Sequence, residues 1–202
     1  GVGRRLGIMQ RCIENIFSIF PPDRETPLAQ DEQHDIGINL HAFFVNIFGL
    51  LDNLAWVWVY EKQLGLAKKD VGLYQKGTQL HLSKKFREYL NSDRMKRWHN
   101  EYLKDFRDAL AHRIPPYVPP NTLNPEQALE VERINKEVAD SYKSLNFESI
   151  NKLYDEEDKI GNACPFFVHS SSESRKAGLH QIIVDFKTVE EIVENFCEMF
   201  EE

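Results

Sequence analysis

Hydrophobic residues recur at spacings of three and four over most of this chain, the pattern of helices that pack one face against a core. The pattern first covers residues 4–20 and stops at Pro21 and Pro22, which cannot continue a helix. A second helix is predicted from about 27 to 65, with Thr26 as its N-cap. Because that length is unusual for a globular helix, we expect a kink within it.

Residues 40–60 form a nearly continuous apolar run, about as long as a bilayer span. Asp52 lies near its middle with Asn46 and Asn53, and these groups would be costly in lipid. We therefore expect a central helix buried by protein, with membrane association as the weaker alternative. The three polar residues are candidate buried partners of the helix that carries Arg107 and His112, and their spacing leaves open which face each takes.

The middle of the chain predicts a loop followed by two helices. Residues 66–80 have little periodicity, and the pattern returns over 83–91. Ser92 or Asp93 then caps a long helix through His112, which should end near Ile114 because two prolines follow. An aromatic and aliphatic stripe repeats every four residues along it, and we expect it in the core rather than on a base-stacking surface. Its members are Trp98, Tyr102, Phe106 and Leu110.

The last third predicts helices and a hairpin. Pro125 opens a helix whose phase slips at 145–147, where we expect a kink or a new helix to about 154. Its predicted inward residues are Val131, Ile134, Val138, Tyr142 and Leu145. The β-branched and aromatic runs 165–168 and 181–186 predict a hairpin, and a capping box at Thr188 and Glu191 opens a final helix.

The fold class predicted is mainly α: a bundle of four to five helices with a small appended β-hairpin near the C-terminus. We expect one domain over 1–202, with a core of about 26–157. The hairpin and the C-terminal helix, 161–202, are expected to be an appendage.

Charge restricts the possible partners. The 202 residues carry a net charge of −7, which argues against indiscriminate nucleic-acid binding. Residues 83–113, however, hold nine Lys and Arg against five acids, a local excess of +4. That excess suits either a local RNA-facing surface or a solvated helix face, and the composition does not choose between them.

Cysteine usage and the N-terminus indicate a cytoplasmic protein. The three cysteines are far apart, so we expect reduced thiols rather than disulfides or a zinc site. No signal peptide or membrane span is expected. Phosphate-binding glycine motifs and metal-ligand spacings are missing from the sequence, so we expect neither cofactor nor metal.

The strongest candidate for chemistry is the end of the long helix, where Arg107, Asp108 and His112 stand before the prolines. Asp108 and His112 are four apart on one face, so the carboxylate could hold the imidazole. Arg107 is about 140° round the helix from His112. A histidine moves protons near neutral pH and a guanidinium stabilises a phosphoryl group, which suits phosphodiester chemistry.

The arginine–histidine spacing is weak by itself. It occurs three times, as Arg94–His99, Arg107–His112 and Arg175–His180, and only the second lies at a helix end with a polar residue after the arginine. A purely structural alternative is that Arg107 and His112 complement the helix dipole.

The run from Arg107 to His112, inside a helical domain, resembles the signature of the HEPN superfamily: arginine, a polar residue, variable positions, then histidine. Residues 47–55 resemble the polar-interrupted core helix of such domains. This chain has aspartate where asparagine is frequent. The motif covers six residues and the helical context about 26–154.

The resemblance implies a metal-independent endoribonuclease that works as a homodimer, in a toxin or phage-defence system with a cognate antitoxin. Arg107 would stabilise the phosphorane, His112 would transfer protons, and Asp108 would orient the imidazole of His112. RNA would be the substrate, bound by Arg94, Arg97, Lys104, Arg113 and Tyr117. The alternative is a catalytically silent helical module that dimerises or binds a ligand or partner.

Overall fold

The structure, a computed structural model, describes residues 1–169 and 176–201. It is mainly helical with a small antiparallel sheet near the C-terminus, which confirms the predicted fold class. A short 3₁₀ turn, η1, lies in the connection after α2, and a π-helical segment, η2, lies between α5 and α6. The elements in order are α1 (Val2–Ile19), α2 (Gln30–Glu61), η1 (Lys68–Asp70), α3 (Lys76–Gln79), α4 (Lys84–Leu90), α5 (Asp93–Lys96), η2 (Arg97–Leu103), α6 (Lys104–His112), α7 (Pro125–Lys143), α8 (Phe147–Glu157), β1 (Phe166–Phe167), β2 (Ala177–Gly178) and α9 (Gln181–Glu201).

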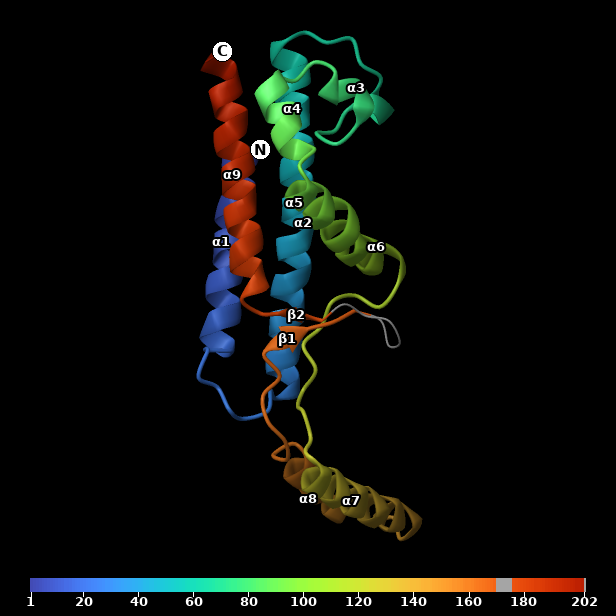
Figure 1. Cartoon of the computed structure of the whole chain (residues 1–202). Helices are drawn as coiled ribbons and strands as arrows, with labels where there is room; N and C mark the ends of the chain where they lie inside the picture. Colours follow the sequence, from blue (N-terminus) through green and yellow to red (C-terminus); the bar gives the residue numbers. More distant parts are fainter. Residues whose placement is uncertain (170–175, 202) are drawn as a thin grey trace.

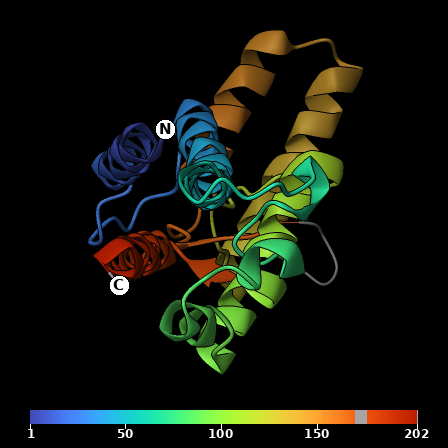
Figure 2. The ribbon, with the colours of Figure 1, turned by 90° about the horizontal axis from the view of Figure 1, so that it is seen from above.

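Three long helices build the body of the protein. Figure 1 shows α1, α2 and α9 side by side, and Figure 2 looks nearly down their axes. Buried residues from all three belong to one hydrophobic cluster, among them Met9, Phe43 and Ile192. The C-terminal helix is thus part of the main core, in contrast to the appendage expected from the sequence.

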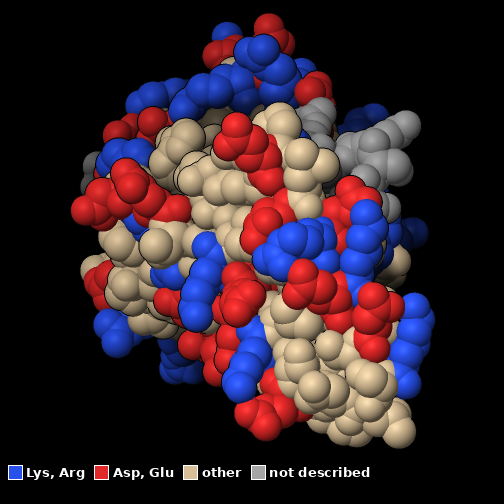
Figure 3. Space-filling view, turned by 90° about the horizontal axis from the view of Figure 1, so that it is seen from below, with Lys and Arg blue, Asp and Glu red and all other residues tan. Residues whose placement is uncertain are grey.

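Helices α7 and α8 form an arm that extends from one end of the body (Figure 1). Its small separate core contains Ile134, Val138 and Leu153. The phase slip is a true helix boundary, as one of the two predicted alternatives had it. Tyr142 and Leu145, predicted to face inward, are 50% and 71% exposed. Acidic and basic side chains are intermingled on the face seen from below in Figure 3.

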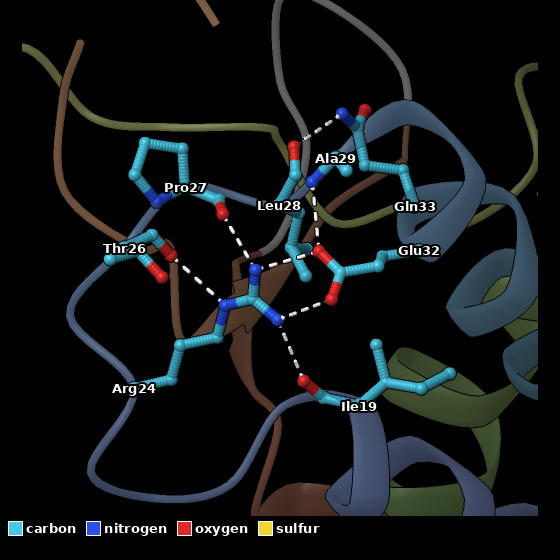
Figure 4. Close-up of polar contacts among 8 residues, drawn as sticks. All are labelled: Ile19, Arg24, Thr26, Pro27, Leu28, Ala29, Glu32 and Gln33. Carbon is cyan, nitrogen blue, oxygen red and sulfur yellow. Dashed lines mark hydrogen bonds and ion pairs between the residues drawn. The ribbon is translucent and has the colours of Figure 1, made fainter. Parts of the chain in front are cut away.

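Arg24 joins the end of α1 to the start of α2 (Figure 4). It donates to the carbonyls of Ile19, Thr26 and Pro27, and it pairs with Glu32 at 2.6 Å. The carboxylate of Glu32 also accepts from the backbone N–H of Ala29, the residue before α2. The prediction of Thr26 as N-cap is therefore wrong, since the helix begins beyond the loop that Arg24 organises.

Helix α2 is one uninterrupted helix of 32 residues, and Figure 1 shows no sharp bend in it. In length and composition it could cross a membrane, and it is the one helix of the described residues that could. Half of its most apolar 18-residue window is buried inside the protein, as in a core helix.

The hairpin is smaller than predicted, and its second strand lies elsewhere. Phe166 pairs with Gly178 and Phe167 with Ala177. Residues 181–186, predicted as a strand, form the first turns of α9. Thr188, predicted to cap a helix, lies inside α9, and its hydroxyl donates to the carbonyl of Val184.

Candidate functional site

The helix that carries the candidate motif is continuous from α5 through η2 to α6. The Ser92 hydroxyl accepts from the N–H of Met95, which confirms the predicted cap. Its innermost residues include Trp98 and Leu103, five apart, a step that an α-helix cannot keep on one face. The π-helical turns of η2 accommodate that step. The helix ends at His112, close to the predicted boundary.

Arg107 lies on the side of α6 that faces α2. Its guanidinium is centred 5.2 Å from the ring of Phe48, and its side chain is 49% exposed. Nε and Nη2 both donate to Oδ1 of Asp108, at 3.0 and 2.8 Å. Arg107 is therefore oriented by its own neighbour and by an aromatic face, and remains open to solvent.

The expected contact between Asp108 and His112 is not formed. His112 is exposed, and no hydrogen bond joins it to Asp108 among the residues that the structure describes. The carboxylate of Asp108 accepts instead from the guanidinium of Arg107. In a single chain, Arg107 and His112 thus stand on different sides of one helix, as the 140° offset predicted.

Two of the five predicted RNA-binding residues are occupied by acids. Arg94 pairs with Glu191 of α9 at 2.5 Å, and Arg113 pairs with Asp105 at 2.8 Å. Because both arginines form ion pairs within the protein, less positive charge is available on this surface to bind an anion.

The other three remain on the surface. Arg97 and Lys104 are exposed, with Nε of Arg97 donating to the carbonyl of Asp93 at 3.3 Å. Tyr117 is 41% exposed and pairs its backbone with Val168 in an isolated bridge. Arg175, the arginine of the third arginine–histidine spacing, lies outside the described residues, so the position of the pair Arg175–His180 is not described.

A buried histidine that sequence reasoning missed contacts the motif helix from the segment after β1. The side chain of His169 is 2% exposed, and its Nε2 lies 2.8 Å from Oδ2 of Asp105. Its ring packs edge-on against Phe106 with centroids 4.8 Å apart. Partial burial would raise the pKa of Asp105, but Arg113 and His169 outweigh it and hold that pKa below its usual value.

A small polar pocket of about 180 Å³ lies between α2, the motif helix and the loop before α3. Asp52, His99 and Arg107 line it together with Phe48 and residues 71–75. The His99 ring stacks on Tyr74, with centroids 3.6 Å apart. The pocket joins Arg107 to the histidine of the first arginine–histidine spacing rather than to His112.

Burial shapes the charges of this pocket. Desolvation lowers the pKa of His99, and the charges of Arg107 and Lys104 lower it further, against the hydrogen bond with Asn100. Desolvation also raises the pKa of Asp52, against the opposing charges of Arg107, Arg5 and His99. The lowered pKa of His99 favours its neutral form, and the raised pKa of Asp52 makes its carboxylate a stronger proton acceptor, so both groups are suited to hydrogen bonding with a ligand.

The three polar residues of the apolar run divide between two faces of α2. Asp52 faces the motif helix, whereas Asn46 and Asn53 face α1. Arg5 donates to Asn53 at 2.7 Å and to Asn46 at 3.0 Å. The sequence suggested all three residues as partners of the motif helix, but only Asp52 lies beside that helix.

Two apolar hollows follow the same face of α2. One of about 260 Å³ lies beside Arg107, between Val45 and Leu110. The other, of about 620 Å³, lies between Ile38 and the proline segment after His112, where His41 Nε2 is 2.9 Å from the carbonyl oxygen of Pro116. The motif is therefore bordered by uncharged surface.

In the described residues, no group of three or more His, Cys, Asp and Glu side chains is arranged to hold a metal ion. Cys12 and Cys164 are buried free thiols, and Cys197 is exposed. Comparisons with protein-family models, with curated proteins and with solved structures gave no match to this chain.

Proposed function

We propose that this chain is a metal-independent endoribonuclease of the HEPN type that acts as a homodimer, with Arg107 and His112 as catalytic residues. The proposal rests on the motif and on one observation: both side chains are exposed, yet they leave one helix in different directions. A single chain cannot easily bring both to one phosphate. Two chains could, with Arg107 from one and His112 from the other.

The surface beside Arg107 supports a second copy as the partner. Large apolar side chains are exposed along α2 and after α6, next to the motif. Contiguous exposed apolar surface commonly marks an interface. Among those nearest the motif are Ile38 at 64%, Val45 at 57% and Ile114 at 49%.

The chemistry would follow from these residues. His112 would accept the proton of a 2′-hydroxyl as the oxygen attacks the adjacent phosphorus. Arg107 would stabilise the charge that develops on the phosphoryl oxygens. The 5′-oxygen would leave with a proton from solvent, giving a 2′,3′-cyclic phosphate and a 5′-hydroxyl end. Asp108 would position the Arg107 guanidinium, in place of the role toward His112 implied by the resemblance.

The biological setting is proposed from the resemblance alone. It would be a cytoplasmic toxin or defence component, held inactive by a cognate antitoxin protein. Free thiols suit a reducing compartment.

A second candidate function is a catalytically silent helical module that binds a partner. The pairing of Arg107 with Asp108 favours it, because a carboxylate beside the arginine opposes an anionic substrate. The ion pairs of Arg94 with Glu191 and of Arg113 with Asp105 also favour this second candidate, because they reduce the positive charge available to RNA.

The deciding experiment incubates structured and single-stranded RNA with wild type, Arg107→Ala and His112→Ala in EDTA. Arg11→Ala and His81→Ala are matched controls, because both residues are exposed and lie outside the candidate site. An endoribonuclease requires cyclic phosphate ends from wild type and controls and their loss in both site variants. No cleavage by any protein would favour the silent module.

Mixing the two inactive variants tests the composite site. If each site takes Arg107 from one chain and His112 from the other, a mixed dimer holds one intact site. Random exchange should then restore about a quarter of the wild-type activity. Sites built within one chain would stay inactive in every mixture.

A further inference from the structure

The pocket that contains Asp52 and His99 is open to a ligand and is not explained by the proposed cleavage chemistry. It lies on the α2 side of Arg107, whereas His112 leaves the helix elsewhere. Asp52 is exposed at its edge. Within the described part of the chain, no protein group donates a hydrogen bond to that carboxylate, although Arg107, Arg5 and His99 act on it through their charge. The Asp52 carboxylate is thus available to accept hydrogen bonds from a ligand in this pocket.

The walls of the pocket suit a flat ligand. Phe48 and the stacked pair of His99 and Tyr74 supply aromatic surface, with the centroids of Phe48 and His99 6.3 Å apart. The cavity of about 180 Å³ has room for a single ring system and not for a large cofactor. Single-stranded RNA is recognised by this combination, in which a splayed base meets aromatic side chains and hydrogen bonds at its edge.

Charge excludes simpler occupants. A free phosphate inside the pocket would meet the Asp52 carboxylate, and the repulsion between the two negative charges opposes its binding. A divalent cation would find one carboxylate beside a guanidinium, and the described residues offer no three-ligand cluster. A neutral ring with N–H donors satisfies Asp52 without opposing Arg107.

We propose that the pocket lined by Asp52, His99 and Arg107 binds a guanine base of single-stranded RNA, whose Watson–Crick edge donates to Asp52. Guanine is the RNA base with two adjacent donors on that edge, N1–H and the 2-amino group, and they match the two oxygens of one carboxylate. This deepens the proposed function, on which it rests, because Arg107 borders the pocket and would contact the phosphate next to the bound base.

The test measures binding in a protein that carries His112→Ala, so that RNA stays intact. Fluorescence anisotropy compares three labelled pentanucleotides of uridine with guanine, inosine or adenine at the centre. Inosine keeps N1–H and loses the 2-amino group. We expect guanine to bind about tenfold more tightly than adenine, with inosine between them. Adding Asp52→Asn should abolish the preference, because the amide offers one acceptor and two unwanted donors.

Asp155→Asn is the matched control, since Asp155 is exposed on α8 and the variant loses the same charge. It should leave the guanine preference unchanged. Equal binding of the three RNAs by the unaltered pocket would overturn the proposal, as would a guanine preference that survives Asp52→Asn.

Cleavage assays separate this proposal from the proposed function. Cleavage that depends on Arg107 and His112 but shows no preference for guanine would leave the nuclease standing and remove the base pocket. Binding of guanine through Asp52 without cleavage by wild type would keep the pocket and remove the nuclease. Guanine-directed cleavage that Asp52→Asn makes indifferent to sequence would support both.

Discussion

The indole Nε1 of Trp98 donates a hydrogen bond to Oδ1 of Asp185 at 2.9 Å, inside the protein where Asp185 is inaccessible to solvent. Tyr102 donates to the other carboxylate oxygen at 2.7 Å, and Gln181 to Oδ1 at 2.9 Å. This carboxylate joins the π-helical segment of the motif helix to α9. Three donors compensate a buried charge, but they do not remove the cost of burying it.

Stability should therefore rise as the pH falls toward 4. Desolvation raises the pKa of Asp185 to about 6, against the hydrogen bonds that lower it. The folded state thus binds the proton more tightly than the unfolded chain, whose ordinary value is 3.8. The resulting stability is complete below the unfolded pKa and is lost as the pH rises through 6, with a span on the order of 3 kcal/mol.

Asp185→Asn isolates this effect from other titrating groups. The amide keeps an acceptor for Trp98 and Gln181 and carries no charge, so the variant should be more stable than wild type at pH 8 and similar at pH 4.5. Urea unfolding at both pH values measures the difference. A wild-type advantage that grows with pH would show that the donors overcome the burial cost.

Asp185 also explains why the end of the chain was mispredicted. The buried positions of α9 include Ile182, Asp185, Val189 and Ile192, a regular helical spacing. A charged residue at one of them hides the period, and the β-branched residues beside it favour a strand. Burial of Asp185 depends on donors from a helix more than eighty residues away, which no local pattern contains.

The candidate site was predictable in part. The prolines after His112 set the end of the helix, and the offset of Arg107 follows from helix geometry. The partner of Asp108 was not predictable, since Arg107 and His112 were both within its reach. The placement of Asp52 and His99 in one pocket and the burial of His169 depend on tertiary packing between segments that share no pattern.

Arg24→Ala should destabilise the protein by about 2 kcal/mol, because it removes a mostly buried guanidinium, leaves three carbonyls without this donor, and leaves Glu32 with the Ala29 N–H alone. The partial exposure of Glu32 keeps the loss below that of a fully buried pair. Thermal or urea unfolding measures it. Arg11→Ala removes an exposed arginine of α1 and should change stability by less than about 0.5 kcal/mol. Equal effects of the two would show that the Arg24 contacts contribute little.

Two glycines of α2 should respond to alanine with opposite sign. A Cβ at Gly37 meets no atom within 4 Å, so Gly37→Ala should stabilise the helix by about 0.5–1 kcal/mol. A Cβ at Gly49 would lie 2.3 Å from Cζ of Arg5, and would push the guanidinium from Asn46 and Asn53. In Gly49→Ala this displacement of Arg5 should outweigh the helix-stabilising effect of alanine, so the variant should be less stable than wild type. Urea unfolding curves of both variants measure the change in the free energy of unfolding. An increase in Gly49→Ala would show that the Arg5 side chain can move without loss of stability.

Two tyrosine hydroxyls form a second matched pair. The hydroxyl of Tyr74 is buried, and no hydrogen-bond partner is found for it among the described residues. Tyr74→Phe should therefore leave stability unchanged or raise it by up to about 1 kcal/mol. Tyr102→Phe removes a donor to Asp185 and should cost about 1–3 kcal/mol near neutral pH. A loss on Tyr74→Phe as large as that on Tyr102→Phe would indicate that a bound water satisfies Tyr74.

Asp108→Asn should strengthen RNA binding, if the proposed function holds. The amide oxygen can still accept from Arg107, so the guanidinium keeps its orientation while its neighbour loses a negative charge. In a His112→Ala background, which prevents cleavage, we expect the apparent affinity for single-stranded RNA to rise about three- to tenfold at low salt. The gain should shrink as salt is added, because screening weakens the repulsion that the substitution removes. Asp155→Asn again controls for net charge, and an equal gain in that variant would show that Asp108 acts only through the total charge of the protein. Weaker binding by Asp108→Asn would mean that the carboxylate itself holds Arg107 in the conformation that meets RNA.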